Sequence, residues 1–252
     1  MPENDTAFGP RDPLVALVLL TRLPLPRLPD AAFQRQARVV WAFPLAGLVV
    51  GGLAALAGVL ALHAGLPAMV AAGLALVVQC AATGAMHEDG LADTLDGLWG
   101  GHTREARLEI MKDSTVGAYG AIALVLSLGL RWALIAALLP VAPGAVVAAA
   151  CLSRAGMPVL MYALPHARDF GLSHGVGRPT ARACAIGLAL GLVLAFLTAG
   201  HETVTGALLG ALALAWLARQ ARKRIGGQTG DILGASQQLG EIAILLALAA
   251  HL

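Results

Sequence analysis

The sequence of 252 residues is poor in charge. Asp, Glu, Lys and Arg together make up 13% of the residues, and 58% are hydrophobic, whereas a soluble globular domain normally carries about 25% charged residues. This shortage argues against a water-soluble protein and favours an integral membrane protein. The formal net charge of +2 is also too small to favour a nucleic-acid partner.

Aromatic residues and cysteines are scarce as well. Aromatics account for 4% of the chain, while the sequence holds 30 glycines and long runs of Ala, Leu and Val, a composition that favours closely packed helices over a membrane β-barrel. The three cysteines, Cys80, Cys151 and Cys184, lie in apolar stretches without a Cys-x-x-Cys pair. They predict neither a disulfide nor a zinc site, and we interpret them as small packing residues.

Long apolar stretches dominate the rest of the chain. A helix needs about 20 apolar residues to cross the hydrocarbon core of a bilayer, and about seven stretches approach that length. They span residues 39–62, 65–86, 114–139, 145–164, 183–200, 204–218 and 232–252. We therefore expect an all-α fold, a polytopic membrane helical bundle that residues 1–252 form as a single domain. The shorter run PLVALVLL (13–20) is expected to lie at the membrane interface or to plug the bundle.

The basic residues predict the orientation of this bundle, because cytoplasmic loops are enriched in Lys and Arg. Fifteen of the 17 Lys and Arg residues fall on one side of the expected spans. These are Arg11, Arg22, Arg27, Arg35, Arg38, Arg104, Arg107, Lys112, Arg168, Arg178, Arg182, Arg219, Arg222, Lys223 and Arg224. We expect the loops 87–113, 165–182 and 219–231 to face the cytoplasm together.

The stretch MHEDGLADTLDG (86–97) places four carboxylates within nine residues, after some twenty residues without charge. In a helix, Asp89, Asp93 and Asp96 would lie within about 60° of one another, and like charges repel strongly near a low-dielectric boundary. A divalent cation would remove that repulsion, and oxygen ligands favour Mg²⁺ or Mn²⁺ over zinc. A merely solvated helix end would carry interspersed Lys or Arg, and none occurs in the stretch. The sequence therefore predicts a metal site.

A second set of polar residues follows in REARLEIMKDSTVGAYG (104–119). Glu109 and Asp113 are four residues apart with Lys112 beside them. A segment that folds back along 87–98 would bring these groups to the same site, with Glu109 as a further metal ligand. The alternative is an amphipathic helix at the membrane surface with a snorkelling Lys112. Carboxylates on a metal with cations nearby indicate a phosphorylated or pyrophosphorylated substrate.

Further positions are suited to contact such a substrate. Arg154 lies inside an apolar stretch, where a charge is costly and usually faces a cavity or a partner, whereas Arg131 lies nearer the opposite side and is expected to snorkel. The stretch GGQTGDILGA contains Gly227, Thr229 and Asp231 immediately before the last span. Free backbone amides at a helix start form an anion site; Asp231 could instead cap the last helix.

Five motifs, taken in order, resemble the cobalamin synthase family, the adenosylcobinamide-GDP ribazoletransferases. They are LTRLPLP (20–26), HEDGLADTLDG, LEIMKDSTVGAYG, SRAGMPVLMYALPHAR (153–168) and GGQTGDILGA. The resemblance covers almost the whole chain. It implies an enzyme of the bacterial inner membrane that joins adenosylcobinamide-GDP to α-ribazole, or to its 5′-phosphate, and releases GMP at a Mg²⁺-dependent site facing the cytoplasm.

The resemblance also implies roles for individual residues. Asp89, Asp93 and Asp96 would hold Mg²⁺ on the diphosphate. The residues implied to neutralise or bind phosphate are Lys112, Arg154, Arg168, Gly227, Thr229 and Asp231. The proton of the attacking hydroxyl would pass to Asp96 or Asp113, and His87 is a further candidate base.

Two other functions are compatible with parts of this pattern. A CDP-alcohol phosphotransferase or a prenyl-diphosphate transferase would also use an Asp-rich metal site at a membrane face, but the strict D-x2-D-G-x2-A-R-x8-G-x3-D-x3-D motif is absent. A cation transporter would place acids at mid-membrane positions in several spans, and here only Glu241 and Glu202 come near such positions. The lipid bilayer is an expected partner, and the sequence leaves open whether the chain also associates with a second copy of itself.

Overall fold

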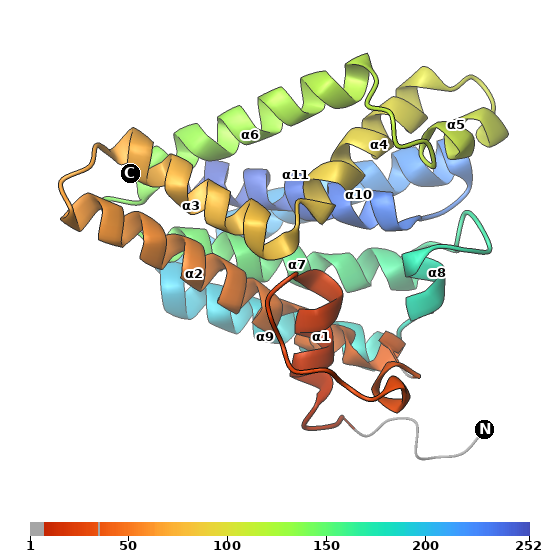
Figure 1. Cartoon of the computed structure of the whole chain (residues 1–252), viewed down its shortest axis with the longest axis horizontal. Helices are drawn as coiled ribbons and strands as arrows, with labels where there is room; N and C mark the ends of the chain where they lie inside the picture. The colour runs from red at the N-terminus through yellow and green to blue at the C-terminus, as the bar shows by residue number, and fades with distance from the viewer. Residues whose placement is uncertain (1–7, 35) are drawn as a thin grey trace.

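The computed structural model describes residues 8–34 and 36–252, and in these ranges the chain is helical apart from loops and one isolated bridge (Figure 1). The long helices are α2 (Phe43–His63), α3 (Ala68–Thr83), α6 (Ala118–Leu138), α7 (Gly144–Ala163), α9 (Ala181–Ala199), α10 (Thr203–Ile225) and α11 (Gly230–Ala249). Each of them overlaps one of the seven apolar stretches. The expected all-α membrane bundle is therefore confirmed.

Among the described residues, five helices are long and apolar enough to cross a membrane, or up to six if the bent pair of α3 and α4 (Met86–Gly100) forms one span. This is lower than the expected seven for two reasons. The stretch Ala181–Ile225 counts once, although it contains α9, the short 3₁₀ turn η4 (Gly200–Glu202) and α10. In addition, α3 has only 16 residues, which is short for a helix that crosses a bilayer alone.

α7 occupies the centre of the bundle, where it packs against α2, α9, α10 and α11. In the most apolar 18-residue segment of α7, 89% is buried inside the protein, whereas the corresponding share for α6 is 22%. α6 and α9 accordingly expose large apolar side chains such as Val125 and Leu197. Because a helix that is apolar all round must meet either protein or lipid, these outer faces fit contact with acyl chains.

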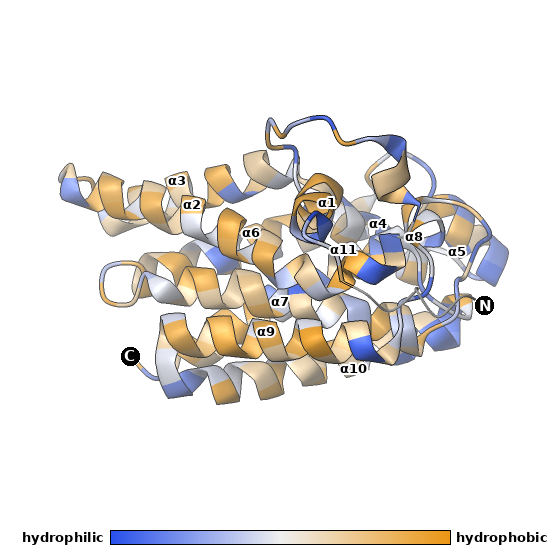
Figure 2. Cartoon of the chain, turned by 90° about the horizontal axis from the view of Figure 1, so that it is seen from below, coloured by the Kyte–Doolittle hydropathy of each residue, from blue (hydrophilic) through white to orange (hydrophobic). Residues whose placement is uncertain are grey.

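Polar residues gather at one end of the bundle, which contains α4, α5 (Arg104–Ile110) and α8 (Leu172–Val176) (Figure 2). There Arg104 donates to the backbone oxygens of Ile225 (3.0 Å) and Ala167 (2.6 Å), and Arg224 donates to the oxygen of Leu98 (2.7 Å). The three charged loops expected on one side of the membrane therefore contact one another. The first of them, 87–113, consists mainly of the two helices α4 and α5.

α1 (Asp12–Leu20) lies across the spans, upright among the horizontal helices of Figure 1 and end-on in Figure 2. Its buried Asp12 accepts hydrogen bonds from Arg38 (3.2 Å) and Trp41 (3.0 Å), which belong to the 3₁₀ helix η3 (Gln36–Ala42). A second 3₁₀ helix, η2 (Asp30–Phe33), lies in the connection. α1 thus packs on the start of α2 and ends at the polar end of the bundle.

Candidate active site

The acidic stretch of the sequence forms the helix that follows an abrupt change in chain direction. α3 ends at Gly84, whose φ of 64° lies in the left-handed region that glycine adopts readily. Ala85 follows with a φ of 55°, which is uncommon for a residue with a side chain. α4 then leaves α3 at an angle of 85°, so its first turn, with His87 and Asp89, packs against α11.

α4 and α11 cross at two glycines. A Cβ atom on Gly90 would lie 2.9 Å from the backbone oxygen of Asp231, and one on Gly234 would lie 3.3 Å from the Cα atom of His87. The first approach is closer than a side chain tolerates and the second is tight, so glycine lets the two backbones meet without a shift. The crossing places the start of α4 beside the start of α11, although the two segments are about 140 residues apart in the sequence.

Gly90→Ala is expected to lower the catalytic rate by on the order of 10²-fold, because the added methyl group would push α4 and α11 apart and misplace the side chains at their ends. The thermal unfolding midpoint should fall only modestly, because the helix preference of alanine offsets part of the cost of the added methyl group. Gly240→Ala, on the same α11, is the control: its Cβ would meet the nearest atom at an ordinary 3.5 Å. Equal rates in the two variants would show that the close crossing is unimportant for activity.

The segment after α7 pairs with the segment before α11. The amide of Gln228 donates to the oxygen of Pro165 over 2.8 Å, and a second backbone hydrogen bond of 2.9 Å joins the same two segments. A side chain on Gly227 would collide with the Pro165 carbonyl, which explains the glycine at that position. The pairing brings Arg168 next to Asp231.

Two side chains hold Asp231. Arg168 Nη2 donates to Asp231 Oδ2 over 3.0 Å, and the hydroxyl of Thr229 donates to the same oxygen over 3.1 Å. The Thr229 oxygen also accepts from the amide of Ile232 at 3.3 Å. Thr229, not Asp231, is therefore the cap of α11. The Arg168 guanidinium in turn lies over the ring of Phe170, 5.3 Å from its centroid.

Two histidines lie beside this pairing. His166 Nδ1 is 3.0 Å from the side-chain nitrogen Nε2 of Gln228. The side-chain oxygen Oε1 of the same Gln228 accepts a hydrogen bond from Ser173 Oγ over 2.5 Å. The rings of His166 and His174 meet edge to face with centroids 5.3 Å apart. Partial burial and the neighbouring His174 and Arg178 lower the pKa of His166. The hydrogen bonds of Gln228 fix α8 against the start of α11.

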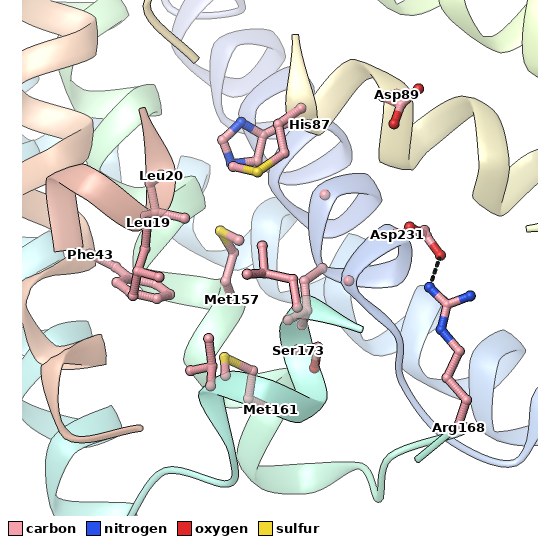
Figure 3. A pocket seen from close by; sticks show the side chains of 16 residues that line it. Leu19, Leu20, Phe43, His87, Asp89, Met157, Met161, Arg168, Ser173 and Asp231 are labelled. Carbon is pink, nitrogen blue, oxygen red and sulfur yellow. Dashed lines mark hydrogen bonds and ion pairs between the residues drawn. The ribbon is translucent and has the colours of Figure 1, made fainter. Parts of the chain in front are cut away.

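These elements enclose a pocket of about 160 Å³ at the polar end of the bundle (Figure 3). One side of it is polar, and the opposite side is apolar. The polar side carries Asp89, Arg168, Ser173 and Asp231, with the Arg168–Asp231 pair drawn as a dashed line. The apolar side carries Leu19 and Leu20 of α1, Phe43 of α2, and Met157 and Met161 of α7. His87 lines the pocket from α4.

Carboxylates crowd the polar side. Asp89 and Asp231 line the pocket, and Asp93, one helical turn after Asp89, is repelled by both and attracted by Arg168. In the part of the chain that the structure describes, no group of three or more His, Cys, Asp or Glu side chains is placed to hold a metal by itself. Mg²⁺, however, is usually bound by one or two carboxylates together with substrate phosphates.

Asp96 contacts the start of α6 instead of the pocket. Its buried carboxylate accepts hydrogen bonds from the backbone amides of Gly117 (2.7 Å) and Gly120 (2.9 Å). A carboxylate in this position satisfies free amides and interacts favourably with the positive end of the helix. The expected stripe of three aspartates is thus divided: Asp89 and Asp93 stay at the pocket side, and Asp96 anchors α6.

Glu109, Lys112 and Asp113 lie on a different surface. They line a hollow on the outer side of α5, and the exposed side chains of Glu109 and Lys112 are paired over 3.7 Å. Asp113 accepts from the amide of Thr115 over 3.1 Å. The structure does not bring these three residues to the pocket, and α5 corresponds to the surface helix that the sequence offered as the alternative.

Two arginines are buried inside the bundle. Arg154 of α7 is 2% exposed and donates to the oxygen of Ala150 in its own helix over 3.0 Å; it is not among the residues that line the pocket. The expectation that Arg131 snorkels toward the membrane surface is wrong, because its side chain is 1% exposed. A buried guanidinium is stable only with partners of opposite charge or with hydrogen-bond acceptors.

Arg131 finds such partners on three other helices. It donates to Glu88 (2.7 Å) and Gln238 (2.7 Å) through Nη1 and to Gln79 (2.9 Å) through Nη2, and Nη2 lies 3.4 Å from Glu241. This cluster, which we call the Arg131 cluster, joins α3, α4, α6 and α11. The sequence signal for it is faint: single polar residues at separate positions inside apolar stretches. It also places one cation between two buried acids, Glu88 and Glu241.

Comparison with known proteins gives a consistent result. A family model described as cobalamin-5-phosphate synthase matches residues 12–249. A protein named adenosylcobinamide-GDP ribazoletransferase from Bradyrhizobium diazoefficiens is 48% identical over 239 residues, which are 94% of this chain and 92% of that protein. Proteins of the same name from Azorhizobium caulinodans (46%, covering 92% of each chain) and Mesorhizobium japonicum (44%, covering 93% and 91%) are also similar. No solved structure matches significantly.

Proposed function

Because the chain belongs to the cobalamin-5-phosphate synthase family, we propose that the pocket between α4, α7 and α11 is its active site. The chain is a multi-pass membrane enzyme that transfers ribazole to adenosylcobinamide-GDP, the last stage of assembling the nucleotide loop of vitamin B12. The observation that carries the site assignment is the polar side of the pocket. There, two motifs far apart in the sequence place Asp89 and Asp231 around Arg168.

The oxygen atoms at the polar side of the pocket suit a hard divalent cation. Asp89 and Asp231 supply oxygen from the pocket wall, and Asp93 lies close enough to interact electrostatically with both. No cysteine is among the described residues that line the pocket, so Mg²⁺ or Mn²⁺ fits better than zinc. When bound with the diphosphate, the cation would neutralise charge on the phosphate oxygens. We assign two of these carboxylates as its protein ligands, with the phosphates completing the shell, which leaves the third free for another role. Asp96 and Glu109, the other two ligands expected from the sequence, lie away from this pocket.

Arg168 places a positive charge of the protein at the wall of the pocket. Its pair with Asp231 and its position over Phe170 fix the guanidinium at the pocket wall, while its remaining N–H groups stay available for phosphate oxygens. The ribazole hydroxyl attacks the phosphorus on the cobinamide side, a new P–O bond forms, and the bond to GMP breaks. We assign the role of proton acceptor to Asp89, because both oxygens of Asp96 already accept amide hydrogens.

The test of this function uses the purified full-length protein in phospholipid vesicles. It is incubated with adenosylcobinamide-GDP and α-ribazole, or its 5′-phosphate, with and without Mg²⁺. We expect equimolar release of GMP and formation of a corrinoid that carries the ribazole base, both dependent on the cation. Equal release of GMP in the presence of EDTA would exclude the proposed metal site. Comparing the rates with α-ribazole and with its 5′-phosphate would also show which one the enzyme prefers.

The membrane orientation gives a further prediction. Single cysteines placed at His102, Arg178 and Lys223, all exposed at the polar end of the bundle, should react with a membrane-impermeant maleimide only from the cytoplasmic side. The excess of Lys and Arg in these loops is the physical reason. Cys151 and Cys184 are buried, so replacing Cys80 with serine gives a suitable background. Reaction of any of the three from the periplasmic side alone would contradict the proposed orientation.

A further inference from the structure

The apolar half of the pocket has no part in holding a diphosphate, and it suggests where one substrate binds. We propose that this half binds the base of the ribazole nucleoside, and that His87 donates a hydrogen bond to the unsubstituted ring nitrogen of that base. The inference rests on the proposed function, because it assigns a subsite within the same pocket. It makes His87 a residue for substrate binding and not the base of the reaction.

His87 lines this space and has a buried polar atom without a partner among the described residues. The side chain is 1% exposed, it lines the pocket (Figure 3), and its Nε2 atom is buried without a hydrogen-bond partner among the described residues. Buried polar atoms in folded proteins nearly always have a partner. A neutral imidazole offers one N–H donor, so a ligand with a single acceptor nitrogen would satisfy it.

The wall below His87 is suited to an aromatic ring. It consists of Leu20, Phe43, Met157 and Met161, each no more than 5% exposed, with Leu19 at its edge. Methionine sulfur and phenylalanine rings make favourable contacts with aromatic groups. The volume of the pocket, about 160 Å³, is close to that of an apolar cavity that admits benzene, about 150 Å³. The enclosed part of the pocket therefore holds one flat ring system, and the ribose and phosphates must lie at its polar edge.

The chemistry of the substrates discriminates between their parts. The base of ribazole is dimethylbenzimidazole, whose ring carries two methyl groups and one nitrogen that is free to accept a hydrogen bond. Guanine carries an amide and an amino group, which would be left unpaired against Met157, Met161 and Phe43 at a cost in binding. The corrin ring is far larger than the pocket. Of these three groups, the benzimidazole matches an apolar wall with a single donor.

The arrangement of the two halves also suits the reaction. With the base against Met157 and Met161, the attached ribose would extend toward Asp89, Arg168 and Asp231 on the opposite side. The hydroxyl that attacks phosphorus would then lie next to the residues that bind the diphosphate. Apolar contacts with the base would thus position the nucleophile, and positioning of this kind contributes substantially to rate.

The experiment compares α-ribazole with its dimethylindole analogue, in which the free ring nitrogen is replaced by CH. Steady-state kinetics of the full-length enzyme in vesicles should give a KM for the analogue that is higher by on the order of tenfold, because the hydrogen bond to His87 is lost. In His87→Leu, the KM values for the two nucleosides should become equal, while the KM for adenosylcobinamide-GDP and kcat stay within about twofold of wild type. His87→Gln, which keeps a donor, should restore part of the discrimination.

Several outcomes would overturn the proposal. Equal KM values for both nucleosides with the wild-type enzyme would exclude the hydrogen bond, and this measurement needs no variant to fold. A large loss of kcat in His87→Leu with unchanged discrimination would assign His87 to the chemical step. The absence of GMP release with wild-type enzyme and both nucleosides would instead refute the proposed function itself. As a test of the wall, Met161→Phe should raise the KM for α-ribazole more than that for the nucleoside of unmethylated benzimidazole.

Discussion

Asp89→Asn and Asp93→Asn are each expected to lower the rate of GMP release at saturating Mg²⁺ by on the order of 10²–10³, the usual effect of removing one group that stabilises charge in a transition state. Both substitutions keep the size of the side chain and remove a negative charge from the polar side of the pocket. Folding should be preserved, because neither aspartate is fully buried and removal of one like charge relieves repulsion. Rates of GMP release and thermal unfolding midpoints of the same preparations would test this.

Three further carboxylates make this test specific. Glu105→Gln is the matched control, because Glu105 lies in the same charged region with its side chain 79% exposed, and it should leave the rate unchanged. Glu109→Gln and Asp113→Asn distinguish the sequence-based set of ligands from the pocket-based one. If either lowered the rate as much as Asp93→Asn does, the hollow on α5 and not the pocket would be where the metal acts.

Arg131→Met is expected to destabilise the folded protein by about 3–5 kcal/mol, the usual result of removing one partner from a buried ion pair. The substitution leaves Glu88 and Glu241 without their cation, and both carboxylates are almost completely buried. Activity should fall along with stability, because Glu88 lies on α4 between His87 and Asp89. The measurement is the thermal unfolding midpoint in detergent, together with the rate of GMP release at a temperature where the variant remains folded.

Arg154→Met is the control for this prediction. Arg154 is buried to the same degree, yet the structure gives it a backbone oxygen as hydrogen-bond acceptor and no ion pair within the described residues. Its replacement should therefore cost much less stability. Adding Glu88→Gln and Glu241→Gln to Arg131→Met should recover most of the lost stability, because the stranded charges are removed. No recovery in the triple variant would mean that Arg131 acts through packing.

The class of fold and the polar end at which we propose the active site follow from the sequence alone. A shortage of charge and apolar stretches near 20 residues predict a helical membrane bundle, because the bilayer core excludes unpaired backbone groups and charged side chains. The acidic stretch around Asp93 and the glycine-rich stretch around Thr229 are local patterns, and each lies at the polar end as expected. Such features can be read from a sequence because they depend on residues that are neighbours in the chain.

The roles of individual side chains were decided by tertiary structure. In the sequence, Asp96 cannot be distinguished from Asp89 and Asp93, because all three lie on one face of a helix. Only the structure shows that α6 packs next to Asp96, so that its carboxylate accepts hydrogen bonds from amides at the start of α6. Arg131 and Arg154 both read as single charges in apolar stretches, and only the packing of α3, α4 and α11 shows that Arg131 has the carboxylate partners. Whether a buried polar group binds a substrate or a neighbouring helix depends on which atoms lie within about 3 Å of it. That proximity is set by helix crossings between distant parts of the chain, such as Gly90 against Gly234, which no local sequence pattern specifies.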